Sequence, residues 1–467
     1  MKKLSALLLA LVLLLSLAPA ALAEPEPWRL DSSSAELNCI SNTIAVKRIY
    51  YYELIDAEGQ VLVPESEKYT LISPVDHQPY FDAYKDAGSS GDGLHRRGLL
   101  AGDGTLLLPA VYADVKILSE RWQIGLILTE TDEANAEYTA YNFPGGKSFY
   151  RVDTADVYFD GQLVGSLSRD AYSGGYPTAH GAYISFESTE GKRRFFDREL
   201  EPSPYSSSYS FEFDTRYENG ETVYYHQGSG QIAFQPECTL DPADLENPYL
   251  YKDGAVYNIR GEKLLDALDY DEVSSFHDGY AITYKDRKKG LLSLDDGELL
   301  PTVYHALGNN EEHPFRYGYI SVIKNGKLGF LDAQGQISVP LDYDGIKADN
   351  YSTFAVVDDP EGGFRVISAA VGELPLPFAG AEFPCQDGCM AFVAMNEEGQ
   401  YAVYDLYGQE LLPFTDCKGI QVSVDGSVLL VDRGVLGYDV YLLNTGMLAD
   451  GGDQVIEIDD DQMSAGF

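Results

Sequence analysis

The seven histidines are the first side chains to consider for acid–base or metal chemistry. They are spread singly along the chain, at His77, His95, His180, His226, His277, His305 and His313. No His-x-His or His-Glu-x-x-His spacing, which would bring two imidazoles to one metal ion, occurs in the sequence. We therefore interpret each histidine as a surface or turn residue and predict no metal ligand among them.

One serine matches a nucleophile pattern. Ser321 and Lys324 have the Ser-x-x-Lys spacing of acylating serine enzymes. That chemistry sets the two side chains one turn apart on a helix, whereas here they lie on an expected strand that leads into the turn Asn325-Gly326. The sequence contains no Gly-x-Ser-x-Gly nucleophile elbow. We predict no catalytic residue.

Carboxylates are abundant, with 74 aspartates and glutamates. Any two could converge as the acid and base of a glycoside hydrolase, so no particular pair stands out. Asp153, Asp156 and Asp160 lie in an expected loop, but their spacing differs from that of a helix-loop-helix Ca²⁺ site and the closing glutamate is missing. The sequence thus predicts no specific metal or cofactor site, while loosely held Ca²⁺ stays open as an alternative.

The five cysteines are Cys39, Cys238, Cys385, Cys389 and Cys417. They are too few and too scattered for a disulfide scaffold. Cys385 and Cys389 are nearest to each other in sequence and could form a local bridge. The odd number leaves at least one thiol unpaired within the chain.

The N-terminus has the pattern of a secretory signal peptide. Two lysines precede an apolar run over residues 4–17, and a small-x-small cleavage site ends at Ala23. We predict a signal peptide over 1–23, cleaved between Ala23 and Glu24. The apolar run is short for a membrane span, so we expect a secreted or extracytoplasmic protein with no membrane insertion after cleavage.

The remaining chain is strongly acidic. Removal of the first 23 of 467 residues leaves 31 basic against 74 acidic side chains, a net charge of −43. Such a surface repels nucleic acid and anionic membranes, and the densest basic runs, 192–194 and 287–289, are short. We predict no nucleic-acid partner and interpret the acidity as a source of solubility outside the cytoplasm.

An internal repeat organises the second half of the chain. Its turn glycines lie 36 to 38 residues apart, at Gly261, Gly297, Gly335, Gly372, Gly408 and Gly446. The best copy runs over 324–346, where two turns bracket short apolar runs typical of consecutive hairpins. Pro340 follows the second of these turns, which suits the end of a strand or an edge strand because proline cannot donate to a ladder.

A unit of about 37 residues accommodates four strands of about five residues and their turns, the size of one propeller blade. We therefore predict an all-β repeat fold, with a β-propeller as first choice and a β-solenoid or ladder of hairpins as the alternative. About eleven units can be counted, whereas four to eight blades are usual. That number favours two modules, an irregular one over 36–240 and a regular one over 241–449. A linker over 24–35 and an acidic tail over 450–467 complete the predicted organisation.

The repeat resembles the WG-repeat (KWG) family of bacterial β-repeats. The shared order is a strand, Gly-Phe/Leu-x-Asp-x-x-Gly, a second strand, Pro, and Tyr-Asp-x-Ile, seen best over residues 329–346. The namesake tryptophan is replaced, since its position holds Arg97, Lys289 and Leu328. The family is defined by its repeat, so the resemblance implies a scaffold or binding role and no catalytic residue.

The 35 tyrosines raise the question of sugar binding, because aromatic rings stack on sugars and anchor interfaces. At recurrent positions such as Tyr270, Tyr304 and Tyr343, packing between repeat units explains them better. We hypothesise an exported, non-catalytic binding or protein-interaction module whose partner is an unknown protein or glycan. The alternatives are a secreted propeller-type hydrolase acting on polysaccharide and an acidic Ca²⁺-dependent surface protein. A deep pocket with two or three convergent carboxylates and an arginine would favour the hydrolase.

Overall fold

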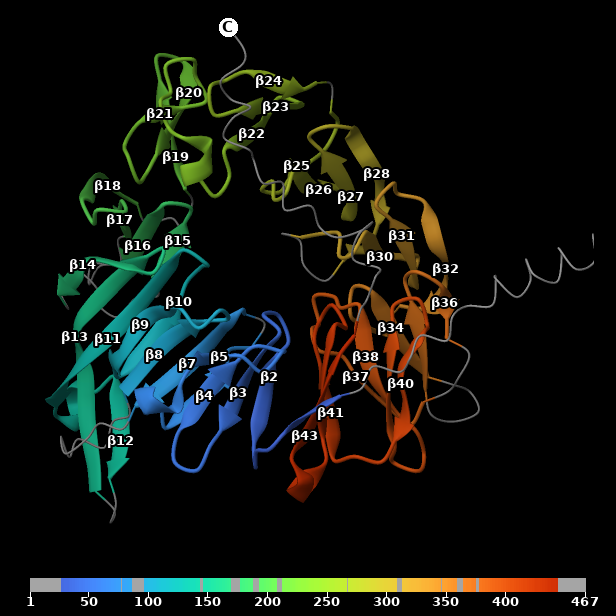
Figure 1. Cartoon of the computed structure of the whole chain (residues 1–467). Coiled ribbons are helices and arrows are strands. Elements are labelled where there is room, and N and C mark those ends of the chain that lie inside the picture. Colours follow the sequence, from blue (N-terminus) through green and yellow to red (C-terminus); the bar gives the residue numbers. More distant parts are fainter. Residues whose placement is uncertain are drawn as a thin grey trace, which may run out of the picture.

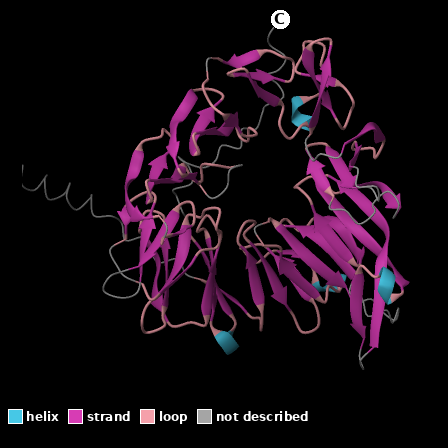
Figure 2. Cartoon of the chain, turned by 180° about the vertical axis from the view of Figure 1, so that it is seen from behind, coloured by secondary structure: helices cyan, strands magenta, loops and turns pink. Residues whose placement is uncertain are grey.

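The structure, a computed structural model, describes residues 27–443 apart from 77, 86–95, 143–145, 169–176, 188–192, 208–211, 267, 309–312, 346, 359–363 and 375–377. Within these residues the chain is almost entirely β-strand (Figure 2). Its helices are single 3₁₀ turns, η1 (Glu65–Glu67), η3 (Glu133–Asn135), η4 (Pro242–Asp244) and η5 (Gly434–Leu436). None of the helices in this described part has the length and apolarity needed to cross a bilayer.

The described strands pair antiparallel in eleven small sheets, most of them four-stranded. The first four sheets contain β2 (Ala35–Asn38), β3 (Thr43–Lys47), β4 (Tyr52–Ile55) and β5 (Val61–Val63); β6 (Leu71–Pro74), β7 (Tyr80–Lys85), β8 (Arg96–Ala101) and β9 (Leu106–Tyr112); β10 (Asp114–Ile117), β11 (Trp122–Thr131), β12 (Tyr138–Asn142), β13 (Gly146–Phe159) and β14 (Gln162–Ser168); and β15 (Thr178–His180), β16 (Tyr183–Glu187), β17 (Arg193–Phe196) and β18 (Pro202–Ser207).

The next four sheets contain β19 (Phe213–Glu218), β20 (Glu221–His226) and β21 (Ile232–Ala233); β22 (Tyr249–Lys252), β23 (Ala255–Asn258) and β24 (Lys263–Leu265); β25 (Glu272–Val273), β26 (Tyr280–Lys285), β27 (Lys288–Ser293) and β28 (Gly297–Tyr304); and β29 (Ala306–Leu307), β30 (Tyr319–Lys324), β31 (Lys327–Asp332) and β32 (Ile337–Asp344). The last three contain β33 (Asp349–Asn350), β34 (Phe354–Asp358), β35 (Phe364–Ser368) and β36 (Gly372–Glu373); β37 (Gly380–Glu382), β38 (Ala391–Met395), β39 (Tyr401–Asp405) and β40 (Glu410–Thr415); and β41 (Gly419–Val422), β42 (Val428–Asp432), β43 (Tyr438–Leu442) and β1 (Trp28–Leu30).

The eleven sheets follow one another around a common axis as the blades of an eleven-bladed β-propeller (Figure 1). The first strand of a sheet, such as β2, β15 or β25, lies towards the axis, and later strands lie further out. The predicted all-β propeller is confirmed, and the solenoid and the open ladder of hairpins are excluded because the last sheet returns to the first. The boundary predicted between residues 240 and 241 falls between β21 and β22, and the division into two modules stays a prediction.

The ring is closed by the N-terminal strand. β1 pairs with β43, so Trp28 lies opposite Val440 and Leu30 opposite Tyr438. Residues 28–30 were expected within a linker, and that expectation is wrong. The polar, proline-containing sequence around them hid a three-residue strand whose partner lies about 400 residues away in the chain.

The repeated aspartate and glycine build the turn between the third and fourth strands. One carboxylate oxygen of Asp332 accepts the backbone N–H groups of Gln334 and Gln336, at 3.0 and 2.8 Å. Gly335 has φ +72°, a left-handed conformation that side chains disfavour. Asp405 and Gly408 repeat the arrangement in another sheet.

The glycine before each Phe or Leu lies in a β-bulge. In β31 the register against β32 shifts between Leu328 and Phe330, on either side of Gly329. A Cβ on Gly329 would lie 2.7 Å from the carbonyl oxygen of Val339, so the two backbones approach too closely for any side chain. Pro340 lies inside β32, the outer strand of its sheet. Its edge position was predicted correctly, whereas the strand does not end there.

The core lies between neighbouring sheets. One buried cluster includes Phe330, Phe354 and Phe392, which come from three successive sheets. Tyr343 packs against the same cluster, as expected for a residue that joins repeat units. At the seam, Leu30 and Val440 pack with Ile44 of the first sheet, so the closing interface is built like the others.

Candidate functional site

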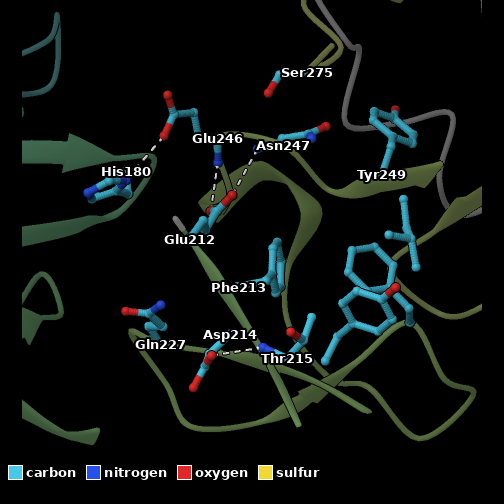
Figure 3. Close-up of a pocket in the computed structure, with 13 residues that line it drawn as sticks. His180, Glu212, Phe213, Asp214, Thr215, Gln227, Glu246, Asn247, Tyr249 and Ser275 are labelled. Atoms are coloured by element: carbon cyan, nitrogen blue, oxygen red, sulfur yellow. Dashed lines mark hydrogen bonds and ion pairs between the residues drawn. The ribbon is translucent and has the colours of Figure 1, made fainter. Parts of the chain in front are cut away.

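A cavity of about 750 Å³ lies where three successive sheets meet near their inner strands (Figure 3). The sheets are β15–β18, β19–β21 and β22–β24, and Ser275 is added by the following sheet, β25–β28. Many lining residues sit on an inner strand or in the segment leading into one. The lining residues are His180, Glu212, Phe213, Asp214, Thr215, Tyr224, Gln227, Phe234, Glu246, Asn247, Tyr249, Leu250 and Ser275.

Glu212 is a buried carboxylate held by backbone donors. One oxygen accepts the N–H of Glu246 at 3.0 Å and the other accepts the N–H of Asn247 at 3.1 Å, as Figure 3 shows. Burial raises the pKa of Glu212 to about 7, although the two hydrogen bonds favour its charged form. The segment leading into β22 is thereby fixed to the segment leading into β19.

His226 lies beside Glu212, at the end of β20. Its ring is 1% exposed, and its Nε2 lies 3.9 Å from a Glu212 oxygen. The backbone N–H of Ser229 donates to Nδ1 at 3.1 Å, which leaves the proton of the neutral ring on Nε2, facing Glu212. Burial, with the neighbouring His180, lowers the pKa of His226 to about 4.

His180 is the last residue of β15 and lies beside the carboxylate of Glu246. Its Nδ1 lies 3.2 Å from the Glu246 carboxylate and its Nε2 lies 3.1 Å from the Ser185 hydroxyl. The ring is 4% exposed. The interpretation of every histidine as a surface or turn residue is therefore wrong for His180 and His226, because singly spaced residues can meet when separate strands become neighbours.

Gln227 has no hydrogen-bond partner for its side-chain amide in the described part of the chain. The residue is 2% exposed, yet neither Oε1 nor Nε2 is paired. Its backbone is fixed, since its N–H donates to the Glu212 carbonyl at 3.0 Å. A buried polar group left unpaired costs about 1–3 kcal/mol, so the unpaired amide that lines the cavity is a candidate contact for a ligand.

Aromatic rings form another wall. The rings of Phe213 and Phe234 lie 5.0 Å apart, and those of Tyr224 and Phe234 lie 5.5 Å apart. Figure 3 shows Phe213 and the polar groups of Glu212 and Gln227 around one space. The cavity therefore combines ring faces with hydrogen-bonding groups, a combination typical of small-molecule sites.

The charges of the cavity are of one sign. Glu212, Asp214 and Glu246 contribute carboxylates, and the described lining residues include neither lysine nor arginine. The Asp214 carboxylate accepts the backbone N–H of Thr215 at 2.9 Å. Such a lining accepts hydroxyl and N–H donors and repels anions.

The structure does not bring the other sequence candidates to this cavity. Ser321 is buried on β30 and accepts a hydrogen bond from Asn350 at 2.8 Å. Lys324, at the end of the same strand, lies over the ring of Tyr304. In a strand, side chains three positions apart point to opposite faces, so Ser321 and Lys324 do not face each other on β30 as they would on a helix.

The three aspartates considered for Ca²⁺ do not form a loop site. Asp153 and Asp156 lie within β13, so the expected loop is wrong there. Asp156 accepts the hydroxyl of Tyr112 at 2.9 Å, and Asp160 pairs with Arg121. Across the described residues, no group of three or more His, Cys, Asp or Glu is arranged to hold a metal ion.

All five cysteines are free, including Cys385 and Cys389, so the local bridge considered from the sequence is not formed. The Cys39 thiol donates to the carbonyl of Pro384 at 3.5 Å, next to Cys385. Burial raises the pKa of the Cys39, Cys385 and Cys389 thiols, which keeps them in the unreactive protonated form.

No family model and no curated protein matches the chain. Among solved structures, a crystal structure of a eukaryotic initiation factor is 9% identical, with 83% of this chain and 88% of that chain covered and a TM-score of 0.32. BamB from Moraxella catarrhalis is 13% identical, with 68% and 100% covered and a TM-score of 0.23. The computationally designed Ika8 protein is 13% identical, with 57% and 95% covered and a TM-score of 0.24.

Proposed function

We propose that the chain is an exported, non-catalytic binding module and that the cavity around Glu212 and Gln227 holds its ligand. The propeller fold fits a protein-interaction module in general terms, because blades on a closed ring present many loops around one axis. The observation that carries the proposal is the buried, unpaired amide of Gln227 in a cavity lined by rings and carboxylates.

The proposal is tested by screening the mature chain against glycan and peptide libraries. The comparison variants are Gln227→Met and Gln123→Met. Gln123 is also a buried glutamine and its Oε1 is unpaired, but it lies away from the cavity and its Nε2 donates to the Ser119 and Glu120 carbonyls. We expect a ligand that Gln123→Met retains and Gln227→Met loses. A screen without any ligand that depends on Gln227 would contradict the proposal.

Export is part of the proposal and is supported by the pattern over residues 1–23. Mass spectrometry of secreted protein should find Glu24 as the first residue. Intact Met1 in the extracellular fraction would refute the processing site. This cleavage leaves β1 in place, because Trp28 lies beyond it.

The repeats are proposed to be degenerate WG repeats. Gly98, Gly290 and Gly329 support this, because a Cβ at each would meet the backbone of the outer strand at 2.7 Å or less. The glycine of the motif thus has the same steric role in three sheets.

A polysaccharide hydrolase is the second candidate, because Glu212, Asp214 and Glu246 share one cavity. The arginine that would strengthen it is not among the described lining residues. Release of reducing ends from a polysaccharide by the wild type, and its loss in Glu212→Gln, would establish this candidate. The Ca²⁺-dependent alternative predicts a lower melting temperature in EDTA, and an unchanged one would remove it.

A further inference from the structure

We infer that the cavity takes a neutral, hydroxyl-rich ligand, a short oligosaccharide. This inference rests on the proposed function, since it names the chemical class of the ligand in that same site. Three independent properties of the cavity lead to it: the hydrogen-bonding capacity of Gln227, the sign of the charges, and the aromatic wall.

The Gln227 amide needs a partner that both donates and accepts. Its Oε1 can accept hydrogen bonds and its Nε2 can donate two, and neither atom has a hydrogen-bond partner in the described structure. An ammonium group can only donate and a carboxylate can only accept, so either would leave one side of the amide unpaired. Neighbouring sugar hydroxyls donate and accept at once, which pairs both sides.

The carboxylates restrict the charge of the ligand. Asp214 and Glu246 line the cavity with Glu212, and no described lining residue is basic, so Asp214 and Glu246 repel an anionic ligand. Glu246 already lies 3.2 Å from His180, and Glu212 already accepts two backbone N–H groups. Because these two carboxylates have partners, the site does not require a cation to neutralise them.

The aromatic wall and the size fit a sugar. Phe213, Tyr224, Phe234 and Tyr249 line the cavity, and ring faces pack against the apolar C–H faces of pyranose rings. A volume of about 750 Å³ is in the range of small-ligand cavities and has room for two or three sugar rings. A peptide also offers amide donors and acceptors, and its Gln227-dependent binding is therefore the competing outcome of the experiment.

The inference is tested by calorimetric titration with trimers of matched size. The neutral probes are trimers of glucose, galactose, mannose and N-acetylglucosamine; the cationic probe is the glucosamine trimer and the anionic probe the galacturonic acid trimer. We expect at least one neutral trimer to bind, with the charged trimers at least tenfold weaker.

Variants of Gln227 separate the possible outcomes. Gln227→Met should weaken the neutral trimer at least tenfold, Gln123→Met should leave it unchanged, and Gln227→Glu should shift preference towards the cationic trimer. Circular dichroism of each variant checks that the fold is retained.

Two results overturn the inference. One is Gln227-dependent binding of a charged trimer, or of a peptide from the library, that is tighter than binding of the neutral trimers. This result would contradict the sugar as ligand but would keep the cavity as a binding site. The other is failure of every neutral trimer to bind in a Gln227-dependent way. If the library screen also yields no Gln227-dependent ligand, the proposed function fails as well.

Discussion

Glu212 and His226 are buried side by side, and burial shifts their pKa values in opposite directions. Folded Glu212 keeps a proton up to a pKa of about 7, whereas the unfolded carboxylate loses it near 4.5, so its contribution to stability falls as pH rises through this window. Folded His226 stays neutral down to a pKa of about 4, whereas the unfolded ring is protonated below 6.5, so its contribution rises with pH. The two effects oppose each other between pH 4.5 and 6.5.

Removing one partner should expose the effect of the other. Relative to the wild type, the free energy of unfolding of Glu212→Gln should gain about 3 kcal/mol between pH 4.5 and 7, because the opposing contribution of Glu212 is removed. That of His226→Asn should lose about 3 kcal/mol relative to the wild type between pH 4 and 6.5. Urea titrations across this range provide the measurement. Equal pH profiles for wild type and both variants would show that the two groups do not titrate as described.

At the scale of single residues the sequence was a poor guide to the site. His180, Glu212 and Gln227 carry no motif, and their neighbourhood depends on which strands become adjacent in the ring. The signal that could have drawn attention is the cluster of aromatic and acidic residues over 212–215 and 246–249, which a search for known motifs passes over. His226 is buried by packing against the rings of Tyr183 and Phe213, which the sequence alone does not reveal.

At the scale of elements the sequence was informative, because the repeat records local backbone geometry. Gly335 and Gly408 were predicted as turn residues, and both adopt positive φ. Asp332 was also expected in a turn, and its carboxylate accepts two backbone N–H groups of that turn. The bulge at Gly329 could not be predicted, because it depends on the register between β31 and β32.

Gly329→Ala should lower the free energy of unfolding by about 1–3 kcal/mol, because the added Cβ overpacks the bulge and must displace the outer strand. The matched control is Gly419→Ala in β41, where a Cβ would meet nothing within 4 Å. That variant should change stability by no more than a few tenths of a kcal/mol. Equal urea midpoints for both variants would contradict the steric role given to Gly329.

At the scale of the whole molecule, closure of the ring depends on β1, a strand in a segment that was expected to be a linker. β1 pairs with β43, and the Trp28 indole N–H donates to the Ala57 carbonyl at 2.9 Å, across the seam between the last and first sheets. Leu37 and Gln421 add a further hydrogen bond across the seam, at 2.7 Å. About eleven repeat units were predicted, and the described strands form eleven sheets. The number of units alone could not show that the sheets close into one ring.

A chain that begins at Ser32 should therefore be less stable than one that begins at Glu24. It loses the pairing of β1 and the burial of Leu30, and burial of a leucine side chain alone contributes about 2 kcal/mol. Urea unfolding followed by circular dichroism measures the difference. Identical midpoints for the two chains would mean that β1 does not close the ring.

The stability of Gln227→Met beside that of Gln123→Met, measured without ligand, shows directly whether the Gln227 amide is reserved for a ligand. If the Gln227 amide is kept unpaired for a ligand, its replacement should leave the free energy of unfolding unchanged or raise it, by up to about 3 kcal/mol. Gln123→Met should be less stable than Gln227→Met, because its Nε2 loses two hydrogen bonds and only its Oε1 is unpaired. A loss of stability in Gln227→Met as large as that in Gln123→Met would show that the amide has a structural partner, and would contradict the assignment of the cavity as a ligand site.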